Sequence, residues 1–187
     1  MKSFLFIRHP QTQWNVEARM QGIKESPLTE HGKESVRQFI RRFQPQFQLD
    51  VIYYAHNKRT EFLARRLYRK FRKQYRLSLM QDARLNEKGF GSYEGATTER
   101  VKKETGYHAG PLEARYTWKP PGGDSYEETL PVVQSFLDEL KRSPYEHGLC
   151  ITSGGIIKLA LHATGLWDIT GMFTHKVKNL DTFEITL

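Results

Sequence analysis

Phe4-Leu5-Phe6-Ile7 is a short apolar run near the start of the chain, and Arg8-His9-Pro10-Gln11-Thr12-Gln13-Trp14-Asn15 follows it directly. The apolar run predicts a buried strand that ends at Arg8-His9. In open α/β sheets, ligands bind at the carboxyl ends of the strands. An arginine there presents a planar fork of donors to a phosphate or carboxylate, and a histidine can act as a base, an acid or a nucleophile. Taken alone, such a pair is more often a surface Arg-His at the end of a strand. Its function therefore has to be inferred from the rest of the chain.

Strand-like and helix-like segments alternate along the rest of the chain. The predicted strands are 3–7, 51–54, 77–80, 149–152 and 182–187, and the predicted helices are 29–43, 57–71, 125–140 and 156–163, with a tight turn at Gly154-Gly155. Strands that alternate with helices predict a mostly parallel sheet covered by helices on both faces. We therefore expect an α/β protein, a three-layer αβα sandwich. With no repeat, low-complexity tract or linker, residues 1–187 are predicted to form a single domain.

Composition restricts the cellular setting. The chain has 187 residues, of which 38% are hydrophobic and 27% charged, values typical of a globular protein. No apolar run reaches the roughly 18 residues that a membrane span needs, so we expect no membrane partner. Cys150 is the one cysteine and cannot form an internal disulfide, which is typical of a reducing cytoplasm.

The net charge of +8 raises the question of an acidic partner. Seven cations lie between Arg65 and Arg76, where they could contact nucleic acid or another polyanion. Apolar residues recur through the same segment at helical spacing, and they are Phe62, Leu63, Leu67 and Phe71. This pattern favours a solvated helix face over a nucleic-acid site, so nucleic acid is disfavoured as a partner.

Further polar segments follow the other predicted strands. Asn57-Lys58-Arg59 follows the second strand, a glycine-containing loop of residues 85–95 follows the third, and Ser153-Gly154-Gly155 follows the fourth. Together with Arg8-His9 these segments resemble the histidine phosphatase superfamily, in its phosphoglycerate-mutase-like branch. The resemblance covers nearly the whole chain, with the motifs in the same order and at similar spacing. It implies the phosphoglycerate-mutase-like version of the αβα sandwich.

The resemblance assigns a role to each matching residue. His9 matches the nucleophile that takes up the phosphoryl group as phosphohistidine, and Arg8 and Arg59 match two phosphate-binding arginines. Glu87 matches the acid that protonates the leaving group. The matching substrate-binding positions are Asn15, Gln21, Gly22, Ser153 and Gly154. Chemistry alone also calls for such residues, because positioned cations stabilise a phosphoryl group in transfer. No metal or cofactor is implied.

One position departs from the family pattern. The family carries a second histidine in a Ser-His-Gly-Gly sequence, whereas this chain reads Thr152-Ser153-Gly154-Gly155, with serine at the histidine's place. Serine donates a hydrogen bond but carries no positive charge, and loss of one well-placed donor typically costs about a hundredfold in rate. His147 lies at the wrong end of its strand to substitute. His56, which is close in sequence to Arg59, is the alternative stand-in. Pro10, where the family has glycine, is a milder departure.

These observations leave several functions open. The first is a phosphomonoester hydrolase that acts through His9 and is weakened by Ser153. The second is a non-catalytic relative that recognises a phosphorylated small molecule or phosphoprotein, and nucleic-acid binding ranks third. Mutase activity ranks below hydrolysis, because mutases of this branch carry additional insertions. We expect substrate selection to depend on residues 96–124, which are predicted to be irregular and to lie over the site.

Overall fold

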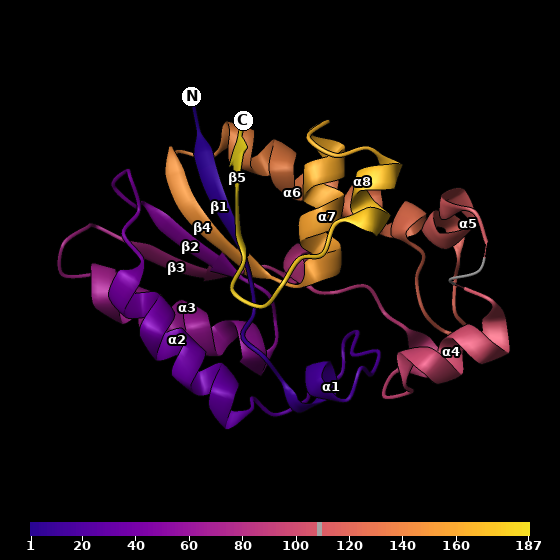
Figure 1. Cartoon of the computed structure of the whole chain (residues 1–187). Helices are drawn as coiled ribbons and strands as arrows, with labels where there is room; N and C mark the ends of the chain where they lie inside the picture. Colours follow the sequence, from indigo (N-terminus) through magenta and orange to yellow (C-terminus); the bar gives the residue numbers. More distant parts are fainter. Residues whose placement is uncertain (108–109) are drawn as a thin grey trace.

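The computed structural model describes residues 1–107 and 110–187, and this part of the chain forms a three-layer αβα sandwich (Figure 1). Its central sheet has five strands in the order β3-β2-β4-β1-β5. β1, β2, β3 and β4 run parallel to one another, and β5 runs antiparallel to its neighbour β1. The strands are β1 Ser3–Arg8, β2 Val51–Tyr54, β3 Ser78–Gln81, β4 His147–Thr152 and β5 Thr182–Thr186. The predicted fold class is therefore confirmed.

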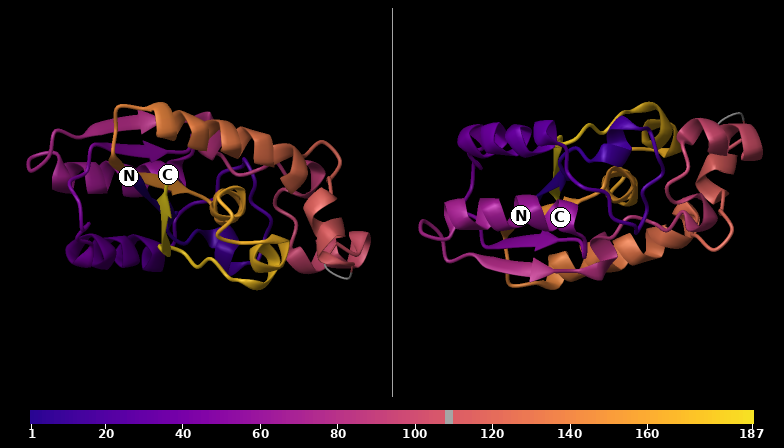
Figure 2. Two further views of the ribbon diagram at one scale, coloured as in Figure 1. Left: turned by 90° about the horizontal axis from the view of Figure 1, so that it is seen from above. Right: turned by 90° about the horizontal axis from the view of Figure 1, so that it is seen from below.

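Helices cover both faces of this sheet. The views from above and below place α2 and α3 on one face and α6 and α7 on the other (Figure 2). The helices are α1 Gln13–Val16, α2 Glu30–Arg42, α3 Lys58–Phe71, α4 Thr98–Thr105, α5 Leu112–Thr117, α6 Tyr126–Arg142, α7 Gly154–Ala163 and α8 Ile169–Thr174. Because successive side chains of a strand point to opposite faces, Phe4 and Phe6 pack in the core under α6 and α7, while Ile7 packs in the core under α2 and α3.

Strand register brings the two motifs nearest the sheet centre together. β1 and β4 are adjacent and parallel, with Arg8 opposite Thr152. The ladder continues one residue further, because the backbone N–H of His9 donates to the carbonyl of Thr152 at 2.9 Å. His9 and Ser153 therefore leave the sheet side by side at its carboxyl edge, although 144 positions separate them in the sequence.

Several elements differ from the sequence prediction, and local hydrogen bonds explain most of them. Thr12 caps α1 in a reciprocal capping box with Asn15, inside a segment predicted to be loop. Residues 96–124 were predicted to be irregular, but they contain α4 and α5; α4 is capped by Thr97 and ends at Gly106 in the left-handed region. Residues 108–109 of that segment lie outside the described residues. The helix α8 was not predicted.

The start of α7 is a second correction. The sequence predicted a tight turn at Gly154-Gly155 and a helix from residue 156, whereas α7 begins at Gly154 with Ser153 as its N-cap residue. Two consecutive glycines lower helix propensity, which is why sequence reasoning places them in a turn. Here the packing of six buried α7 residues against the sheet outweighs that preference.

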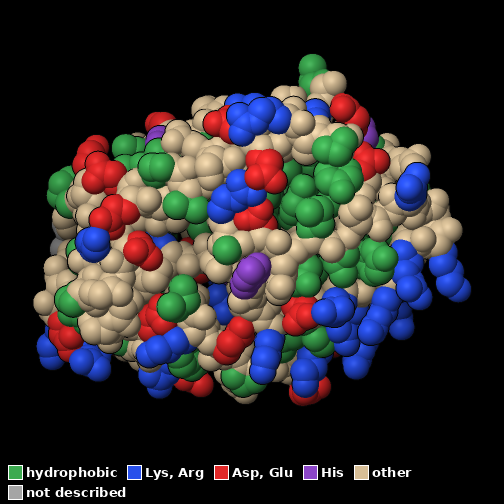
Figure 3. All heavy atoms as spheres, turned by 180° about the vertical axis from the view of Figure 1, so that it is seen from behind, with side chains coloured by type: hydrophobic (Ala, Val, Ile, Leu, Met, Phe, Trp, Pro, Cys, Tyr) green, Lys and Arg blue, Asp and Glu red, His purple; other side chains and the backbone are tan. Residues whose placement is uncertain are grey.

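The basic cluster is largely solvated, as predicted, and it runs from α3 into the residues that follow the helix. Leu63, Leu67 and Phe71 are buried against the sheet, and Phe62 is half-buried with the Arg66 guanidinium over its ring. Figure 3 shows Lys and Arg side chains gathered on this side of the molecule; the exposed members are Arg65, Arg69, Arg72, Lys73 and Arg76. In the described part of the chain, no helix combines the length and apolar character that crossing a bilayer requires.

Candidate active site

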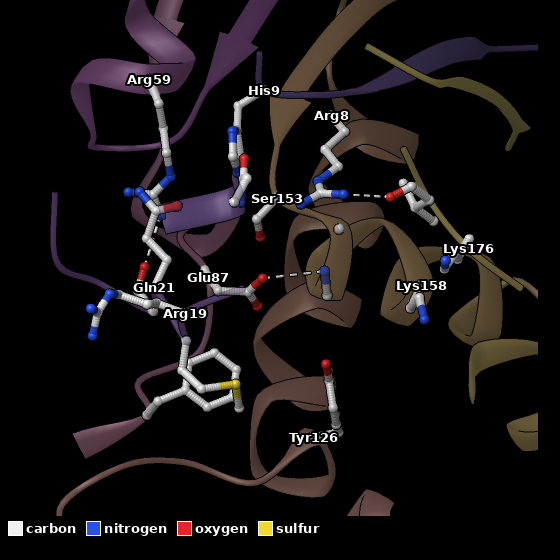
Figure 4. A pocket seen from close by; sticks show the side chains of 17 residues that line it. Arg8, His9, Arg19, Gln21, Arg59, Glu87, Tyr126, Ser153, Lys158 and Lys176 are labelled. Carbon is white, nitrogen blue, oxygen red and sulfur yellow. Dashed lines mark hydrogen bonds between the residues drawn. The ribbon is translucent and has the colours of Figure 1, made fainter. Parts of the chain in front are cut away.

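A pocket of about 290 Å³ opens at the carboxyl edge of the sheet, where β1 and β4 end (Figure 4). All nine residues that the sequence selected as catalytic or substrate-binding line this pocket. They are Arg8, His9, Asn15, Gln21, Gly22, Arg59, Glu87, Ser153 and Gly154. They come from four separate segments of the chain, so the fold assembles the site and no single motif contains it. Their chemical roles remain predictions.

His9 is buried and held in one orientation. Its side chain is only 3% exposed, and its Nδ1 lies 2.8 Å from the carbonyl oxygen of Pro10. A carbonyl oxygen can only accept, so Nδ1 carries the hydrogen and Nε2 of the neutral ring keeps its lone pair. Burial, followed by the positive charges of Arg8 and Arg59, lowers the pKa of His9 well below its usual value. The neutral, nucleophilic form is therefore favoured.

Two arginines flank His9, of which Arg59 is buried and Arg8 is half-buried. Arg59 is 2% exposed and donates from Nη2 to the carbonyl of Gly22 at 2.8 Å and from Nη1 to that of Lys24 at 3.0 Å. Arg8 donates from Nη1 to the carbonyl of Val177 at 2.6 Å. Nε of each arginine is buried without a hydrogen-bond partner. Buried donors without partners are costly, so these two cations are suited to an anion that supplies the acceptors.

Burial also lowers the pKa of both arginines. The carboxylate of Glu87 is the largest opposing influence on Arg8, and Glu25 is the largest on Arg59. An arginine keeps its proton even after such a shift, because its ordinary pKa lies far above neutral pH. The pocket therefore holds two permanent positive charges close to the imidazole.

The Glu87 carboxylate lies across the pocket from His9 and is held by backbone donors. Its Oε2 accepts from the N–H of Gly155 at 3.2 Å, and its Oε1 accepts from the N–H of Lys88 at 3.1 Å. This position requires glycine at residue 155, because a Cβ there would lie 2.3 Å from Glu87 Oε1. The first turn of α7 thus positions the candidate acid.

Ser153 directly follows β4 and points into the same pocket (Figure 4). It is 3% exposed, and its hydroxyl is buried without a hydrogen-bond partner. Although Ser153 occupies the N-cap position of α7, its side chain makes no capping bond. A serine at an N-cap usually bonds to the helix backbone, so this hydroxyl remains available to a bound ligand.

Asn15 and Gln21 tie the first loop to the site. The Asn15 Oδ1 accepts from the Thr12 N–H and from Asn179 Nδ2, each at 3.1 Å, and Asn179 Nδ2 also contacts the carbonyl of His9 at 2.8 Å. Gln21 Oε1 accepts from the Thr12 hydroxyl at 3.1 Å, which leaves Gln21 Nε2 buried without a partner. Both amides thus keep an NH₂ group for a ligand while their oxygens hold the loop.

Neither alternative histidine reaches the pocket. His56 is exposed and does not line it; its backbone N–H binds Asn86 Oδ1 at 2.7 Å. His147 begins β4 at the opposite edge of the sheet, where its ring stacks on Phe47. The suggestion that His56 replaces the second histidine is therefore wrong. Among the described residues, no group of three or more His, Cys, Asp or Glu side chains is arranged to hold a metal ion.

The structure adds pocket residues that the sequence did not select. Lys158 projects from α7, and Lys176 comes from the segment between α8 and β5. The others are Arg19, Met20, Phe90, Tyr126, Gly155 and Val177. Lys158 follows Gly154 by four residues, so the helical repeat could have placed both on one face. No local signal identifies Lys176, because its loop reaches the pocket only through tertiary contacts.

Comparison with known proteins identifies the class that this fold and pocket represent. The model of the histidine phosphatase superfamily (branch 1) matches residues 4–187. The chain therefore belongs to the histidine phosphatase superfamily, as the motifs around Arg8, Arg59 and Glu87 indicated.

Individual relatives include both phosphatases and mutases. Phosphoserine phosphatase 1 of Hydrogenobacter thermophilus is 24% identical over 168 residues, which cover 87% of this chain and 75% of that protein. The 2,3-bisphosphoglycerate-dependent phosphoglycerate mutase of Bartonella henselae is 27% identical over 130 residues, which cover 68% of this chain and 63% of the mutase. The match thus spans less than two thirds of the mutase's length.

Solved structures share the fold over nearly the whole chain. A mycobacterial glucosyl-3-phosphoglycerate phosphatase, solved in complex with VO₃, has a TM-score of 0.79 at 22% identity and covers 100% of this chain and 93% of its own. The alpha-ribazole phosphatase of Shigella flexneri has a TM-score of 0.81 at 21% identity, with coverage of 99% and 90%. These similarities establish the fold.

Proposed function

We propose that this protein hydrolyses phosphomonoesters through a phosphohistidine at His9, at a rate reduced by the serine at position 153. The observation that carries the proposal is the state of His9, whose Nδ1 is held by the Pro10 carbonyl while Arg8 and Arg59 flank the ring. Membership of the histidine phosphatase superfamily supports the same reaction class. The interpretation of Ser153 as the counterpart of the family's second histidine is part of this proposal.

In the first step, Nε2 of His9 attacks phosphorus while the bond to the leaving oxygen breaks. Glu87 in its acid form gives its proton to that oxygen, so the alcohol leaves neutral. Arg8 and Arg59 stabilise the negative charge on the equatorial phosphoryl oxygens. The Ser153 hydroxyl and the Gln21 NH₂ group, both now without partners, add neutral donors.

In the second step, water attacks phosphorus and gives a proton to the Glu87 carboxylate. The phosphorus–nitrogen bond breaks, its electron pair returns to His9 Nε2, and inorganic phosphate leaves. The Pro10 carbonyl stabilises the hydrogen on Nδ1 throughout. Each residue returns to its starting protonation state, so the cycle needs no cofactor or metal.

Phosphate release from p-nitrophenyl phosphate tests the proposal. We expect the unaltered protein to show low turnover that His9→Ala abolishes, whereas His31→Ala, at an exposed histidine of α2, leaves it unchanged. Rapid quenching should trap an acid-labile phosphohistidine. Vanadate should compete with the substrate; the structure of the mycobacterial phosphatase was solved in complex with VO₃. Turnover that persists in His9→Ala would refute the proposal.

A non-catalytic role is the alternative, and the Ser153 hydroxyl without charge or partner is the observation that favours it. In that case phosphate and p-nitrophenyl phosphate would bind without release of p-nitrophenol. Calorimetric titration of both compounds distinguishes the two functions, since binding without His9-dependent turnover supports only the second.

A further inference from the structure

The strand β3 forms a free edge of the central sheet. It pairs with β2 on one side, and no described strand lies on its other side (Figure 1). The N–H groups of Ser78 and Asp82 donate to backbone carbonyls of β2 and the residue before it, at 2.9 and 3.0 Å. Because the backbone groups of a strand point to alternate sides, those of Leu79 and Gln81 point away from the sheet. Such a row of unpaired N–H and C=O groups is a template for another extended chain.

Arginines of α3 and of its C-cap residue lie beside this edge. A groove of about 250 Å³ lies between α3 and β3, and its lining residues are Arg65, Tyr68, Arg69, Arg72 and Leu79. We call Arg65, Arg69 and Arg72 the groove arginines. In the described part of the chain, Arg69 and Arg72 are exposed and have no ion pair, whereas Arg65 pairs with Glu61 at 2.7 Å. These cations are suited to carboxylates carried on an extended backbone.

The opposite face of β3 offers different surroundings. Ser78 and Met80 point toward α6, where the Tyr145 hydroxyl lies 3.3 Å from Ser78 Oγ and 3.9 Å from Met80 Sδ. Met80 is 40% exposed, so it offers apolar surface at the edge. Arg84, on this side, already pairs with Glu139 at 2.7 Å. A chain laid along β3 would thus have one face toward free cations and the other toward apolar surface.

We infer that the free edge of β3 and the groove arginines form a docking site for an extended acidic segment of a partner protein. The segment adds to the five-stranded sheet as a further strand, with carboxylates toward α3 and alternating apolar side chains toward Met80. This site shares no lining residue with the active-site pocket. The inference therefore does not depend on the proposed function.

Two other occupants match the surface less well. Antiparallel pairing of β3 with a second copy about a two-fold axis would bring the groove arginines of both copies onto one face, where like charges repel. Nucleic acid matches the charge of the groove, but it lacks the alternating backbone N–H and C=O groups that complete a sheet edge. An acidic peptide satisfies both the backbone and the cations.

Calorimetric titration with short peptides tests the docking site. The probe is the acetylated and amidated peptide Glu-Val-Glu-Val-Glu-Val. Lys-Val-Lys-Val-Lys-Val keeps the alternation with the opposite charge, and Glu-Glu-Glu-Val-Val-Val keeps the composition without the alternation. We expect the alternating acidic peptide to bind about tenfold or more tightly than either control, and more weakly as salt is added. Equal Kd values for the two acidic peptides would overturn the inference, because charge alone would then explain binding.

N-methylation of the probe tests the strand hydrogen bonds without changing the protein. In an extended peptide, the Glu and Val nitrogens point to opposite edges. One probe is methylated at every Glu nitrogen and the other at every Val nitrogen. Because only one edge of the peptide meets β3, one probe should keep its affinity and the other should lose at least about tenfold. Equal affinity of the two methylated probes would refute strand addition.

Variants of the protein test each half of the site. Gln81→Pro removes an outward N–H at an exposed edge position, where proline is tolerated, and should weaken binding about tenfold, whereas Gln81→Ala keeps the N–H and the affinity. The double variant Arg69→Gln/Arg72→Gln should also weaken binding about tenfold. Its matched control is Lys102→Gln/Lys103→Gln, which removes two exposed charges from α4. Equal losses in the two double variants would overturn the role of the groove arginines.

The other occupants give different outcomes. Analytical ultracentrifugation that finds a dimer, which Gln81→Pro separates, would show that a second copy occupies the edge. Tighter binding of a thymidine oligonucleotide than of the alternating acidic peptide, lost in Arg69→Gln/Arg72→Gln but kept in Gln81→Pro, would show a nucleic-acid site. Either result would overturn the inference.

Discussion

Replacing Ser153 by histidine should raise phosphatase activity, because position 153 lies beside the candidate nucleophile. The Ser153 hydroxyl is buried without a partner, and the register of β1 and β4 places residue 153 next to His9. An imidazolium there would add a charged donor to the transferring phosphoryl group. Removing one such donor from an active site typically costs about 100-fold to 1000-fold in kcat.

The expected gain is smaller than that full range. Serine already supplies a neutral donor, and a neutral hydrogen bond is about half as strong as a charge-assisted one. We therefore expect kcat to rise about 10-fold to 100-fold in Ser153→His. Because the Arg8 guanidinium lies against the start of α7, it disfavours protonation of the new imidazole. The gain should therefore be larger at pH 5.5 than at pH 7.5.

The assay is initial-rate phosphate release between pH 5 and pH 8, with circular dichroism to confirm folding. Ser153→Gln, which has similar reach but no charge, is the matched control and should show no comparable gain. If Ser153→His folds normally yet shows neither a higher kcat nor tighter vanadate inhibition at any pH, the reasoning about residue 153 is wrong.

Three further outcomes follow from the site geometry. The pKa of His9 is lowered by burial and by the charges of Arg8 and Arg59, so below about pH 6.5 the unfolded chain binds a proton at this histidine that the folded chain does not bind. Urea titration should therefore show that the free energy of unfolding falls with acidification more steeply in the unaltered protein than in His9→Gln. Gly155→Ala should lower kcat at least about tenfold by displacing the Glu87 carboxylate, and overpacking should destabilise the protein by roughly 1–3 kcal/mol. The control is Gly165→Ala, where a Cβ would have open space but φ is +75°, and it should leave kcat unchanged. An unaltered kcat in Gly155→Ala would contradict the role of Glu87. Arg59→Lys should raise the Ki of vanadate about tenfold, because lysine cannot reproduce the fork that binds two carbonyls; equal inhibition would exclude Arg59 from the phosphate site.

Much of the site could be predicted from the sequence because its motifs sit at strand ends. A strand that ends in Arg8-His9 and one that ends before Ser153 must bring those residues to the carboxyl edge of a parallel sheet. The apolar runs predicted the strands, and the helix caps at Thr29, Asn57 and Ser125 agree with the predicted helix starts. Local sequence signals did not predict the start of α7, because there the low helix propensity of two glycines is outweighed by tertiary packing.

The sequence by itself thus determined the fold class, the edge of the sheet that holds the site, and the identity of its two arginines, histidine and glutamate. Only the tertiary structure decided that His56 lies outside the pocket, because that depends on where its loop runs. It also placed Lys158 and Lys176 beside Arg8, since a helix face and a distant loop meet only when the sheet brings them together. Lastly, it showed that the Ser153 hydroxyl has no partner, a property of the packed surroundings that no spacing of residues encodes.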